Sequence, residues 1–527
     1  MKEIRHQLII ACVAIIIILG LFFRFANIGK KVYWTDEIYT SVRISGHTIQ
    51  EYTQDNFNGG IIQVKALQDY LQPRPQNGLS DTMKALVNKS EHPPLYYLMA
   101  HFWVRWFGNT PSVTRSLSAL ISLLVFPALY WLCQELFESP ITGWIAVALI
   151  AVSPVHILYA QEARQYSLWT VTILLSCAAL CRAMRMKTPG NWGIYAVTLS
   201  LALYSHLLSF LVLIAQAIYV AAMNRWRLTQ QFKAYLFALT GAIVIFLPWF
   251  VLIREVRATG WTSKDIPLWI LFKRWMFNLA AVFFDPQISY DKQLFDIRYG
   301  MDNGLFGLNY PLTYLVIPIL LLVAYAIYFL IRTTPKRVWL FVLILISVTA
   351  LPLALPDLLG RGQRSTIARY LIPSFLGIQL AVAYLLSVKI TPSFAQTRQQ
   401  KLWQVATVIL ISLGILSSAV SSQSETWWNK YTNYYDPQVA RIINQSPTPL
   451  VISSSVVRTT SLSYWLNPEI QLIVIEAPPL PDNLNQFSDV FLFQPTNDLR
   501  AELEQQSPYP IKPVYPLGWL WQILSSN

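Results

Sequence analysis

Charged residues are scarce in this chain of 527 residues, and their scarcity excludes two broad classes of protein. Lysine, arginine, aspartate and glutamate together make up 13% of the sequence, whereas a soluble globular domain usually carries about a quarter. Hydrophobic residues reach 54%, and the mean hydropathy is +0.41. The composition therefore excludes an ordinary cytosolic enzyme and a disordered chain.

Cysteines and nucleotide-binding loops are also missing or few. The four cysteines lie within or at the edge of apolar stretches and form no CxxC pair, which supports neither a metal knuckle nor a disulfide scaffold. The sequence contains no GxGxxG loop and no P-loop, the glycine-rich motifs that bind nucleotides. Acidic residues number 27 against 40 basic ones. In a soluble protein this excess would suggest nucleic acid, but here membrane topology explains it, and we expect no nucleic-acid partner.

Apolar runs long enough to cross about 30 Å of hydrocarbon recur along the chain. The first of them lacks a small-residue cleavage site before Arg24, so we interpret it as a retained span rather than a signal peptide. The run Pro94–Phe107 is too short for a span and fits a re-entrant or interfacial helix better. About eleven transmembrane helices are predicted, at roughly 8–23, 115–136, 140–158, 166–182, 192–206, 207–223, 234–253, 311–331, 337–355, 369–388 and 402–420.

The distribution of basic residues orients these spans. If Pro94–Phe107 does not cross, four basic loops lie on the same side as the N-terminus: 182–191, 224–233, 332–337 and 389–401. Cytoplasmic loops carry an excess of lysine and arginine. Glu135 and Glu138 would then also be cytoplasmic, although acidic residues count for little in this rule. We predict a multi-pass protein of the cell inner membrane, with a cytoplasmic N-terminus and an extracytoplasmic C-terminus.

Three segments outside the membrane follow from this topology. Two are outer loops, 24–93 and 254–310, and the third is the tail 421–527. The tail alternates helix-like stretches (Pro437–Asn444, Asn497–Gln506) with β-branched runs (Leu450–Ser453, Ile470–Ile475, Asp489–Phe493), which indicates a small α/β domain. The predicted fold is thus an all-α polytopic membrane domain, residues 1–420, followed by an extracytoplasmic α/β domain.

Unusual polar residues fall on the outer side of this arrangement. They are Asp36, Glu37, His92, Glu162, Arg164, His206, Arg361, Arg364, Arg369 and Tyr370. Ionisable residues at membrane depth are expensive, and they mark functional sites by default. Taken singly, each has a structural explanation. Thr35 or Asp36 suits a helix N-terminus, His92 precedes prolines that suit a helix start, and arginines anchor at headgroups.

The chemistry that these residues suggest is sugar transfer from a lipid phosphate. A carboxylate pair can act as general base toward a hydroxyl. Arginines bind phosphate through bidentate, charge-assisted hydrogen bonds, and they would stabilise the charge that develops on a departing polyprenyl phosphate. A substrate that combines phosphate with a long lipid would enter from the bilayer.

Several motifs together resemble those of a known family. They are Trp34–Glu37, His92–Tyr97, Ser153–His156, Tyr159–Tyr166 and Arg369–Pro373. In this order and spacing they are similar to the bacterial dolichyl-phosphate-mannose-protein mannosyltransferase-like family, which is related to the lipid A aminoarabinose transferases and has the membrane C-type glycosyltransferase fold. Gln165 departs from the family pattern, in which an aliphatic residue or methionine precedes the tyrosine.

The resemblance implies specific roles. Asp36 corresponds to the catalytic base, with Glu37 beside it, and Arg164 to the arginine that meets the donor phosphate. His92 corresponds to the histidine that opens the helix after the loop. The family typically inverts configuration by direct attack of the acceptor hydroxyl on the anomeric carbon.

Further site residues are predicted with these. Arg369, Arg364, Tyr166 and Tyr370 are the other candidates for the donor phosphate, and Glu162 and His206 for the remainder of the site. Family members differ in whether they hold a divalent metal, so Asp36, Glu37, His92, Glu162 and His206 are candidate ligands for Mn, Mg or Zn.

The predicted function is therefore an integral-membrane glycosyltransferase. Its donor is a polyprenyl-phosphate-linked sugar, and its acceptor is a hydroxyl on a glycolipid or a protein, as in lipopolysaccharide or other cell-envelope synthesis. Two other classes fit a polytopic protein: a lipid or solute transporter, and a membrane scaffold whose tail binds a partner. Transporters usually contain internal repeats and midplane sites, and no repeat is apparent here. An acid pair in a long outer loop is required by neither alternative.

Overall fold

The computed structural model describes residues 2–56, 59–88, 91–253, 262, 265–287, 310–360, 362–391, 397–476, 484–506, 510–515 and 518–524. Two compact units make up the chain. The first comprises Met1–Ile28, Lys89–Tyr96 and Arg115–Gln423, and the second comprises Gly29–Asn88, Tyr97–Thr114 and Ser424–Asn527. Much of the predicted outer loop 254–310 lies outside the described residues, as does Arg361.

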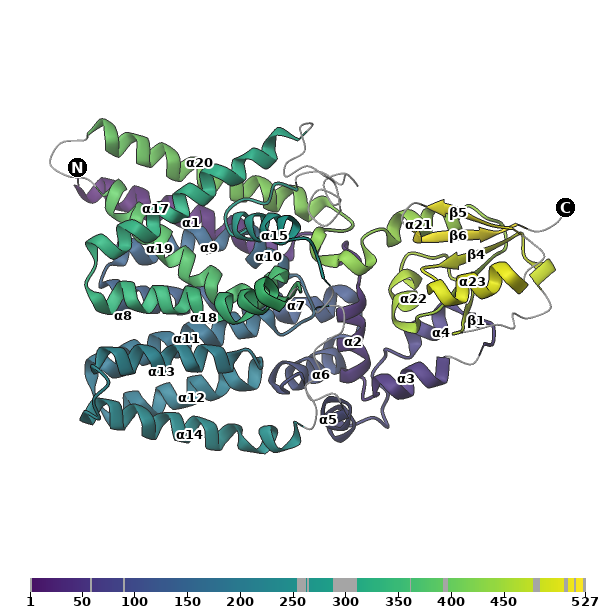
Figure 1. Cartoon of the computed structure of the whole chain (residues 1–527), viewed down its shortest axis with the longest axis horizontal. Helices are drawn as coiled ribbons and strands as arrows, with labels where there is room; N and C mark the ends of the chain where they lie inside the picture. Colours follow the sequence, from purple (N-terminus) through teal and green to yellow (C-terminus); the bar gives the residue numbers. More distant parts are fainter. Residues whose placement is uncertain are drawn as a thin grey trace. The chain divides into compact units, whose positions relative to one another are not determined.

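The first unit is a bundle of helices (Figure 1). Its elements are α1 (Lys2–Phe25), α7 (Pro111–Ser122), α8 (Val125–Phe137), α9 (Pro140–Ala151), α10 (Pro154–Ala160), α11 (Tyr166–Met186), α12 (Pro189–Ser205), α13 (Ser209–Met223), α14 (Gln230–Leu252), α15 (Leu268–Ala280), η2 (Pro311–Leu315), α17 (Val316–Thr333), α18 (Lys336–Gly360), η3 (Arg364–Thr366), η4 (Ala368–Leu371), α19 (Ile372–Ile390) and α20 (Arg398–Gln423). Each of the eleven predicted segments is helical.

Fewer of these helices are long enough to cross a bilayer unaided. Seven are both long and apolar enough among the described residues, or eight if the bent pair α9 and α10 forms one span. The apolar part of α1 (Ala11–Phe25) and α13 are shorter, and α12 has 17 residues. The number eleven therefore stays a prediction.

Two helices form the centre of the bundle. α11 packs against α8 and α12, whereas α19 packs against α9, α17 and α18. The apolar windows of α11 and α19 are 78% and 89% buried by protein, but those of α14 and α17 only 28%. The peripheral helices thus present their apolar side chains outward, as expected where lipid replaces water as the solvent.

The break between α9 and α10 bends this segment by 62°. Pro154 opens α10, and proline removes one N–H from the helix ladder. Arg24 binds the buried C-terminal end of α9: its guanidinium donates to the carbonyls of Ala151 (2.8 Å) and Ile150 (3.3 Å). Gly20 permits this approach, because a Cβ there would lie 2.4 Å from the Ala151 oxygen. Arg24 therefore satisfies carbonyls that helix ends otherwise leave without partners.

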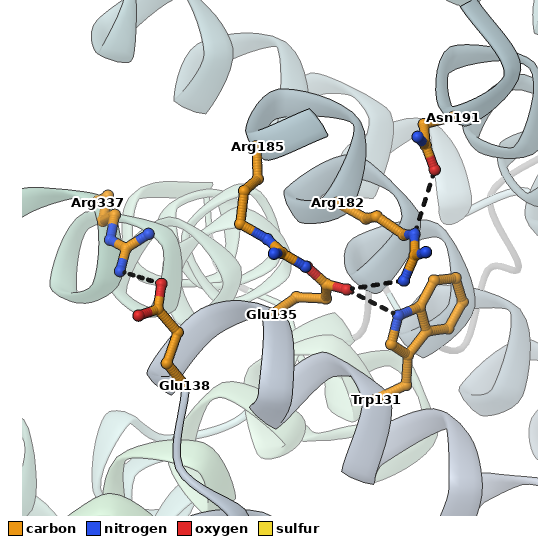
Figure 2. A network of polar contacts seen from close by, with 7 residues as sticks. All are labelled: Trp131, Glu135, Glu138, Arg182, Arg185, Asn191 and Arg337. Carbon is orange, nitrogen blue, oxygen red and sulfur yellow. Dashed lines mark hydrogen bonds and ion pairs between the residues drawn. The ribbon is translucent and has the colours of Figure 1, made fainter. Parts of the chain in front are cut away.

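A polar network joins three helix ends of the bundle (Figure 2). Glu135, at the end of α8, accepts from Arg185 at 2.6 Å and from Arg182 at 3.3 Å, both on α11. Glu138 pairs at 2.7 Å with Arg337, at the start of α18. The acids that weakened the positive-inside argument thus contact arginines of the predicted cytoplasmic loops, so the three turns lie at one end of the bundle.

The second unit combines helices from the first predicted outer loop with the tail. Its elements are α2 (Thr35–Ile44), α3 (Ile49–Asn56), β1 (Ile62–Gln63), α4 (Val64–Asp69), α5 (Leu79–Asn88), most of α6 (Leu95–Phe107), η5 (Trp428–Asn433), α21 (Asp436–Ile443), β2 (Pro449–Ser453), α22 (Val456–Ser463), β3 (Gln471–Val474), η6 (Leu484–Gln486), β4 (Asp489–Phe493), α23 (Asn497–Gln506), β5 (Ile511–Tyr515) and β6 (Leu520–Ile523). The strands and helices predicted for the tail are confirmed.

One mixed sheet organises this unit, with strand order β1-β3-β2-β4-β6-β5. β2 lies between β3 and β4 and runs parallel to both, with Val451 opposite Leu472 and Phe491. Every residue of β2 is buried, as expected for a parallel strand that is covered on both faces. β1 comes from the first outer loop and pairs with β3, Ile62 opposite Leu472. The tail therefore does not build its sheet alone.

Candidate functional site

The turn 161–165 connects α10 to α11 and carries Arg164. All five of its residues are buried. The side-chain amide of Gln161 donates to the carbonyls of Phe23 (2.8 Å) and Ala26 (2.9 Å). The backbone N–H of Arg164 donates to the Glu162 carbonyl at 2.7 Å. These bonds fix the backbone from which the Arg164 side chain extends.

Two arginines from separate turns flank one aromatic ring. The Cζ atom of Arg164 lies 5.9 Å from the ring centroid of Tyr166, and that of Arg369, in η4, lies at the same distance. Arg369 also lies 5.5 Å from the ring of Tyr370. The two arginines are only 4% and 8% exposed. A guanidinium over a ring face gains a cation–π interaction, and two positive charges are thereby held near each other in a largely dehydrated place.

His206 completes this group of side chains. It caps the C-terminus of α12 and stacks on Trp169, with ring centroids 4.3 Å apart. Its ring lies 6.1 Å from that of Tyr166 and 6.4 Å from that of Tyr370. The backbone N–H of Leu208 donates to Nδ1 at 3.1 Å, so in the neutral ring the proton is on Nε2. We call Arg164, Tyr166, Trp169, His206, Arg369 and Tyr370 the arginine–aromatic cluster.

The cluster unites five residues that the sequence predicted and one that it did not. Arg164, Tyr166, His206, Arg369 and Tyr370 are far apart in sequence, and the structure brings them together. Trp169 was missed, although its position three residues after Tyr166 places both on one face of α11. Both arginines act electrostatically on His206. The grouping is an observation, whereas the role in phosphate binding stays a prediction.

The His92–Tyr97 motif connects to the same turn through two hydroxyl groups. Tyr96 and Ser118 form a hydrogen bond of 2.7 Å, and the Ser118 hydroxyl donates to the Arg164 carbonyl at 3.1 Å. The Ser118 proton is used in the second bond, so Tyr96 is the donor in the first. All three residues are buried. The motif thus supports the backbone beneath Arg164.

The remaining predicted residues of this unit have other partners. His92 Nε2 lies 3.5 Å from Glu91 Oε1. Glu162 is fully buried in the turn before α11. Arg364 makes a 3.4 Å ion pair with buried Asp357, which also accepts at 2.7 Å from the N–H and hydroxyl of Ser365. Arg364 is therefore engaged by an acid.

The acid pair lies in the second unit, in the first turn of α2. The helix begins at Thr35, and its N-cap is Trp34, which makes no side-chain cap. The interpretation of Thr35 or Asp36 as the capping side chain is therefore wrong. Both acids nevertheless lie where the helix dipole favours negative charge. Asp36 is partly exposed, whereas Glu37 is fully buried.

Glu37 and Thr35 are bound by residues of the tail. Glu37 Oε2 lies 3.2 Å from Lys430 Nζ, and the two side chains are 0% and 1% exposed. Asn433 Oδ1 accepts from the backbone N–H of Thr35 at 3.0 Å and from its hydroxyl at 2.8 Å. The two neighbouring acids thus have different surroundings: Glu37 is buried in a pair with Lys430, whereas Asp36 is partly exposed.

Lys430 and Asn433 were missed by sequence reasoning. They belong to the run Trp427–Tyr435, which begins seven residues after the last predicted span (402–420) and is dense in aromatic and amide side chains. That density was a signal for a buried segment. It could not reveal the partner, because Glu37 and Lys430 are 393 positions apart.

Metal binding has no support from the described part of the chain. No three histidine, cysteine, aspartate or glutamate side chains within it approach closely enough to hold a metal ion. Of the candidate ligands, Glu37 pairs with Lys430 and His92 lies against Glu91. The binding of Mn, Mg or Zn by these residues stays a prediction.

Comparison with known families identifies the relationship that the motifs predicted. Residues 91–252 match the family described as Dolichyl-phosphate-mannose-protein mannosyltransferase. This region includes Arg164, Tyr166, Trp169 and His206. The predicted resemblance is confirmed over this region. No curated protein matches the sequence.

One solved structure shares the fold, and two others align less closely. ArnT from Cupriavidus metallidurans, bound to undecaprenyl phosphate, aligns with a TM-score of 0.50 and 11% identity over 97% of this chain and 98% of that chain. Its apo state gives 0.48 at 11% identity over 97% of each chain. An apo oligosaccharyltransferase from Archaeoglobus fulgidus gives 0.43 at 12% identity, over 89% of this chain and 64% of that chain. At 11% identity the first match shows the ArnT-like fold alone.

Proposed function

We propose that this protein is a membrane glycosyltransferase that moves a sugar from a polyprenyl-phosphate donor to a hydroxyl of a glycolipid or protein. The observation that carries the proposal is the arrangement of Arg164 and Arg369 around Tyr166. Two buried guanidinium groups at the ends of apolar helices are suited to an anion whose remainder is lipid. The family match over this region supports the same reaction class.

The cluster accounts for recognition of the donor phosphate. A guanidinium over an aromatic face keeps its N–H donors at its edge, which is the geometry of bidentate binding to phosphate oxygens. His206 adds an Nε2–H donor when it is neutral. In a site of low polarity these interactions are stronger than in water. ArnT, whose fold this chain shares, binds undecaprenyl phosphate, which favours a polyprenyl lipid as the carrier.

The acid pair supplies the base. The acceptor oxygen attacks the anomeric carbon, the bond from that carbon to the phosphate oxygen breaks, and polyprenyl phosphate departs. The acceptor proton passes to a carboxylate, and configuration at the anomeric carbon inverts. We assign the base to Asp36 rather than Glu37, because Glu37 is buried against Lys430. The arginines stabilise the negative charge that develops on the leaving phosphate.

The reaction is proposed for the outer face of the cytoplasmic membrane. The basic loops define the cytoplasmic end, and the network of Glu135 with Arg182 and Arg185 lies at that end. Turn 161–165 is at the other end of α11 from Arg182, so Arg164 faces the opposite side of the membrane.

The test uses purified full-length protein in nanodiscs. A panel of undecaprenyl-phosphate sugars, labelled in the sugar, is offered with envelope glycolipids and with peptide hydroxyls as acceptors. We expect labelled acceptor together with released undecaprenyl phosphate. Separately, undecaprenyl phosphate alone should raise the melting temperature of wild type but not of Arg164→Ala. Vectorial movement of an intact lipid across vesicles, without transfer, would instead support a flippase.

A further inference from the structure

We propose that Lys430 and Asn433 are positioning residues, which fix the first turn of α2 and thereby orient Asp36. The inference rests on the proposed function, because it takes Asp36 as the base. It also assigns a task to the tail: its sheet supports the catalytic acid.

Three of the four residues in the motif Trp34–Glu37 contact the segment Lys430–Asn433. Lys430 Nζ lies 5.2 Å from the Trp34 ring centroid and 3.2 Å from Glu37 Oε2. Asn433 binds the backbone and side chain of Thr35. Asp36, like Thr35, is partly exposed, whereas Trp34 and Glu37 are buried.

These contacts are made at the N-terminal end of α2, where backbone N–H groups lack partners within the helix. The side chain of the N-cap residue Trp34 has no oxygen that could accept from them. Asn433 Oδ1 supplies the missing acceptor to the N–H of Thr35, from 398 positions away. Residues 34, 35 and 37 surround position 36 within one turn. Fixing all three determines the direction of the Asp36 Cα–Cβ bond.

Asn433 and Thr432 are in turn bound by residues next to the sheet. Asn433 Nδ2 donates at 2.8 Å to Asp436 Oδ2, which also accepts from Ser461 at 3.0 Å. Gln494 Nε2 donates at 3.3 Å to the carbonyl of Thr432. Ser461 is on α22, which follows β2, and Gln494 directly follows β4.

This support comes from a special place in the sheet. The chain passes from β2 to β3 on one side, and β4 then lies on the other side of β2. Open α/β sheets bind their ligands at the carboxyl ends of strands where the strand order reverses. In this chain the residues that follow β2 and β4 hold the segment Lys430–Asn433, so the usual ligand position is used for support of α2.

A purely stabilising role predicts a different result from a positioning role. Loss of stability lowers the amount of folded enzyme, but the folded enzyme keeps its turnover. Misplacement of a base by about 1 Å can reduce turnover of the folded enzyme about a hundredfold. Donor binding should be unaffected, because the residues assigned to the phosphate are others.

The variants are Lys430→Met, Asn433→Ala and the double change Glu37→Gln with Lys430→Met. The matched control is Lys84→Met in the same unit, which breaks the ion pair with Glu51 whose side chains are 70% and 44% exposed. Full-length proteins in nanodiscs are compared by hydrogen–deuterium exchange of the peptide 32–44 and by transfer kinetics per folded molecule.

We expect faster exchange in the first turn of α2 for Lys430→Met and Asn433→Ala. Their kcat should fall at least about tenfold, with the donor KM changed by less than about twofold. The double variant should recover part of this loss, because it leaves no buried charge without its partner. Lys84→Met should match wild type.

Two results would overturn the inference: unchanged exchange in both single variants, or faster exchange with unchanged kcat. The proposed function fails separately, if wild type transfers sugar from no polyprenyl-phosphate donor. The exchange measurement then still decides whether Lys430 and Asn433 fix α2.

Discussion

The indole of Trp169 stacks on the imidazole of His206, with ring centroids 4.3 Å apart and an interplanar angle of 19°. Trp169 is itself fixed, because its Nε1–H donates at 2.9 Å to Ser209 on α13. His206 is thus held by its ring face and by its Nδ1 acceptor, and its Nε2–H is directed by both.

His206→Phe should keep the stack but lose the Nε2–H donor. A hydrogen bond to a charged group contributes about 1.5–3 kcal/mol, so we expect the KM for a polyprenyl-phosphate sugar to rise about tenfold or more. His206→Gln retains an N–H donor, so its KM for the donor should lie between those of wild type and His206→Phe. Titration of initial transfer rates against donor checks this, and an unchanged KM in His206→Phe would assign the residue to packing alone.

Arg164→Ala should raise the requirement for donor more strongly than any other single change in the cluster. The lost interaction is a charge-assisted bond to a poorly solvated phosphate, about 2–3 kcal/mol. Arg164→Lys should rescue only in part, because an ammonium lacks the planar, two-pronged geometry. Arg227→Ala, on an exposed turn, is the control. Equal donor dependence in Arg164→Ala and in this control would exclude Arg164 from the site.

Asp36→Asn should abolish transfer without unfolding the protein. A positioned general base contributes roughly a hundred- to ten-thousand-fold, and asparagine cannot accept the proton. Glu37→Gln should instead reduce stability by about 3–5 kcal/mol, because it leaves Lys430 buried without its counter-charge. Transfer assays paired with thermal melting distinguish the loss of catalysis in Asp36→Asn from the loss of stability in Glu37→Gln. If Glu37→Gln abolished transfer at unchanged stability, Glu37 would be the base.

Asp436 should make the second unit less stable as the pH rises. Burial raises the pKa of its carboxyl from 3.8 to about 8, so the folded chain keeps a proton that the unfolded chain has lost. Stability from this group is complete below about pH 4 and declines as the pH rises through about 8. Asp436→Asn cannot ionise, so its melting temperature should exceed that of wild type by more at pH 9 than at pH 5. A constant difference would contradict the shift.

Glu135→Gln should lower the melting temperature by several degrees, because it brings Arg182 and Arg185 together without the acid between them. Its side chain is 4% exposed. Glu138→Gln is the matched control: its pair with Arg337 is 58% and 43% exposed, and such surface pairs contribute little.

Cysteines introduced at positions 138, 187 and 336 should all be labelled from the cytoplasmic side. Opposite labelling of any one would refute the proposed topology.

Local patterns in the sequence were sufficient for the helices and for the tail. Apolar runs predicted eleven helical segments of the bundle, and β-branched runs predicted β2, β3 and β4. The helix α15 was not predicted, because it lies in the segment 254–310 that was interpreted as an outer loop. The motifs also predicted five members of the arginine–aromatic cluster, because polar residues at membrane depth are conspicuous. Trp169 was not conspicuous, since one more aromatic residue in an apolar helix carries no separate signal.

Long-range pairings were beyond such reasoning. β1 has two residues, too few for any periodicity, and it joins the sheet only because β3 offers an edge. Lys430 could not be assigned to Glu37 from the sequence, since many acids and bases lie at comparable separations. The different surroundings of Asp36 and Glu37 follow from that pairing, and so the choice between them required the structure.

The pairing of Glu37 with Lys430 also dictates an order of events in biosynthesis. At about 5–20 residues per second, translation of the 393 positions between them takes about 20–80 s. Throughout that time the loop carrying Asp36 has left the ribosome, but the residues that bind Trp34, Thr35 and Glu37 do not yet exist. Closing so long a loop is slow. The second unit can therefore fold only after the helices between its two parts have been inserted, and a nascent chain has no oriented base until its membrane domain is complete.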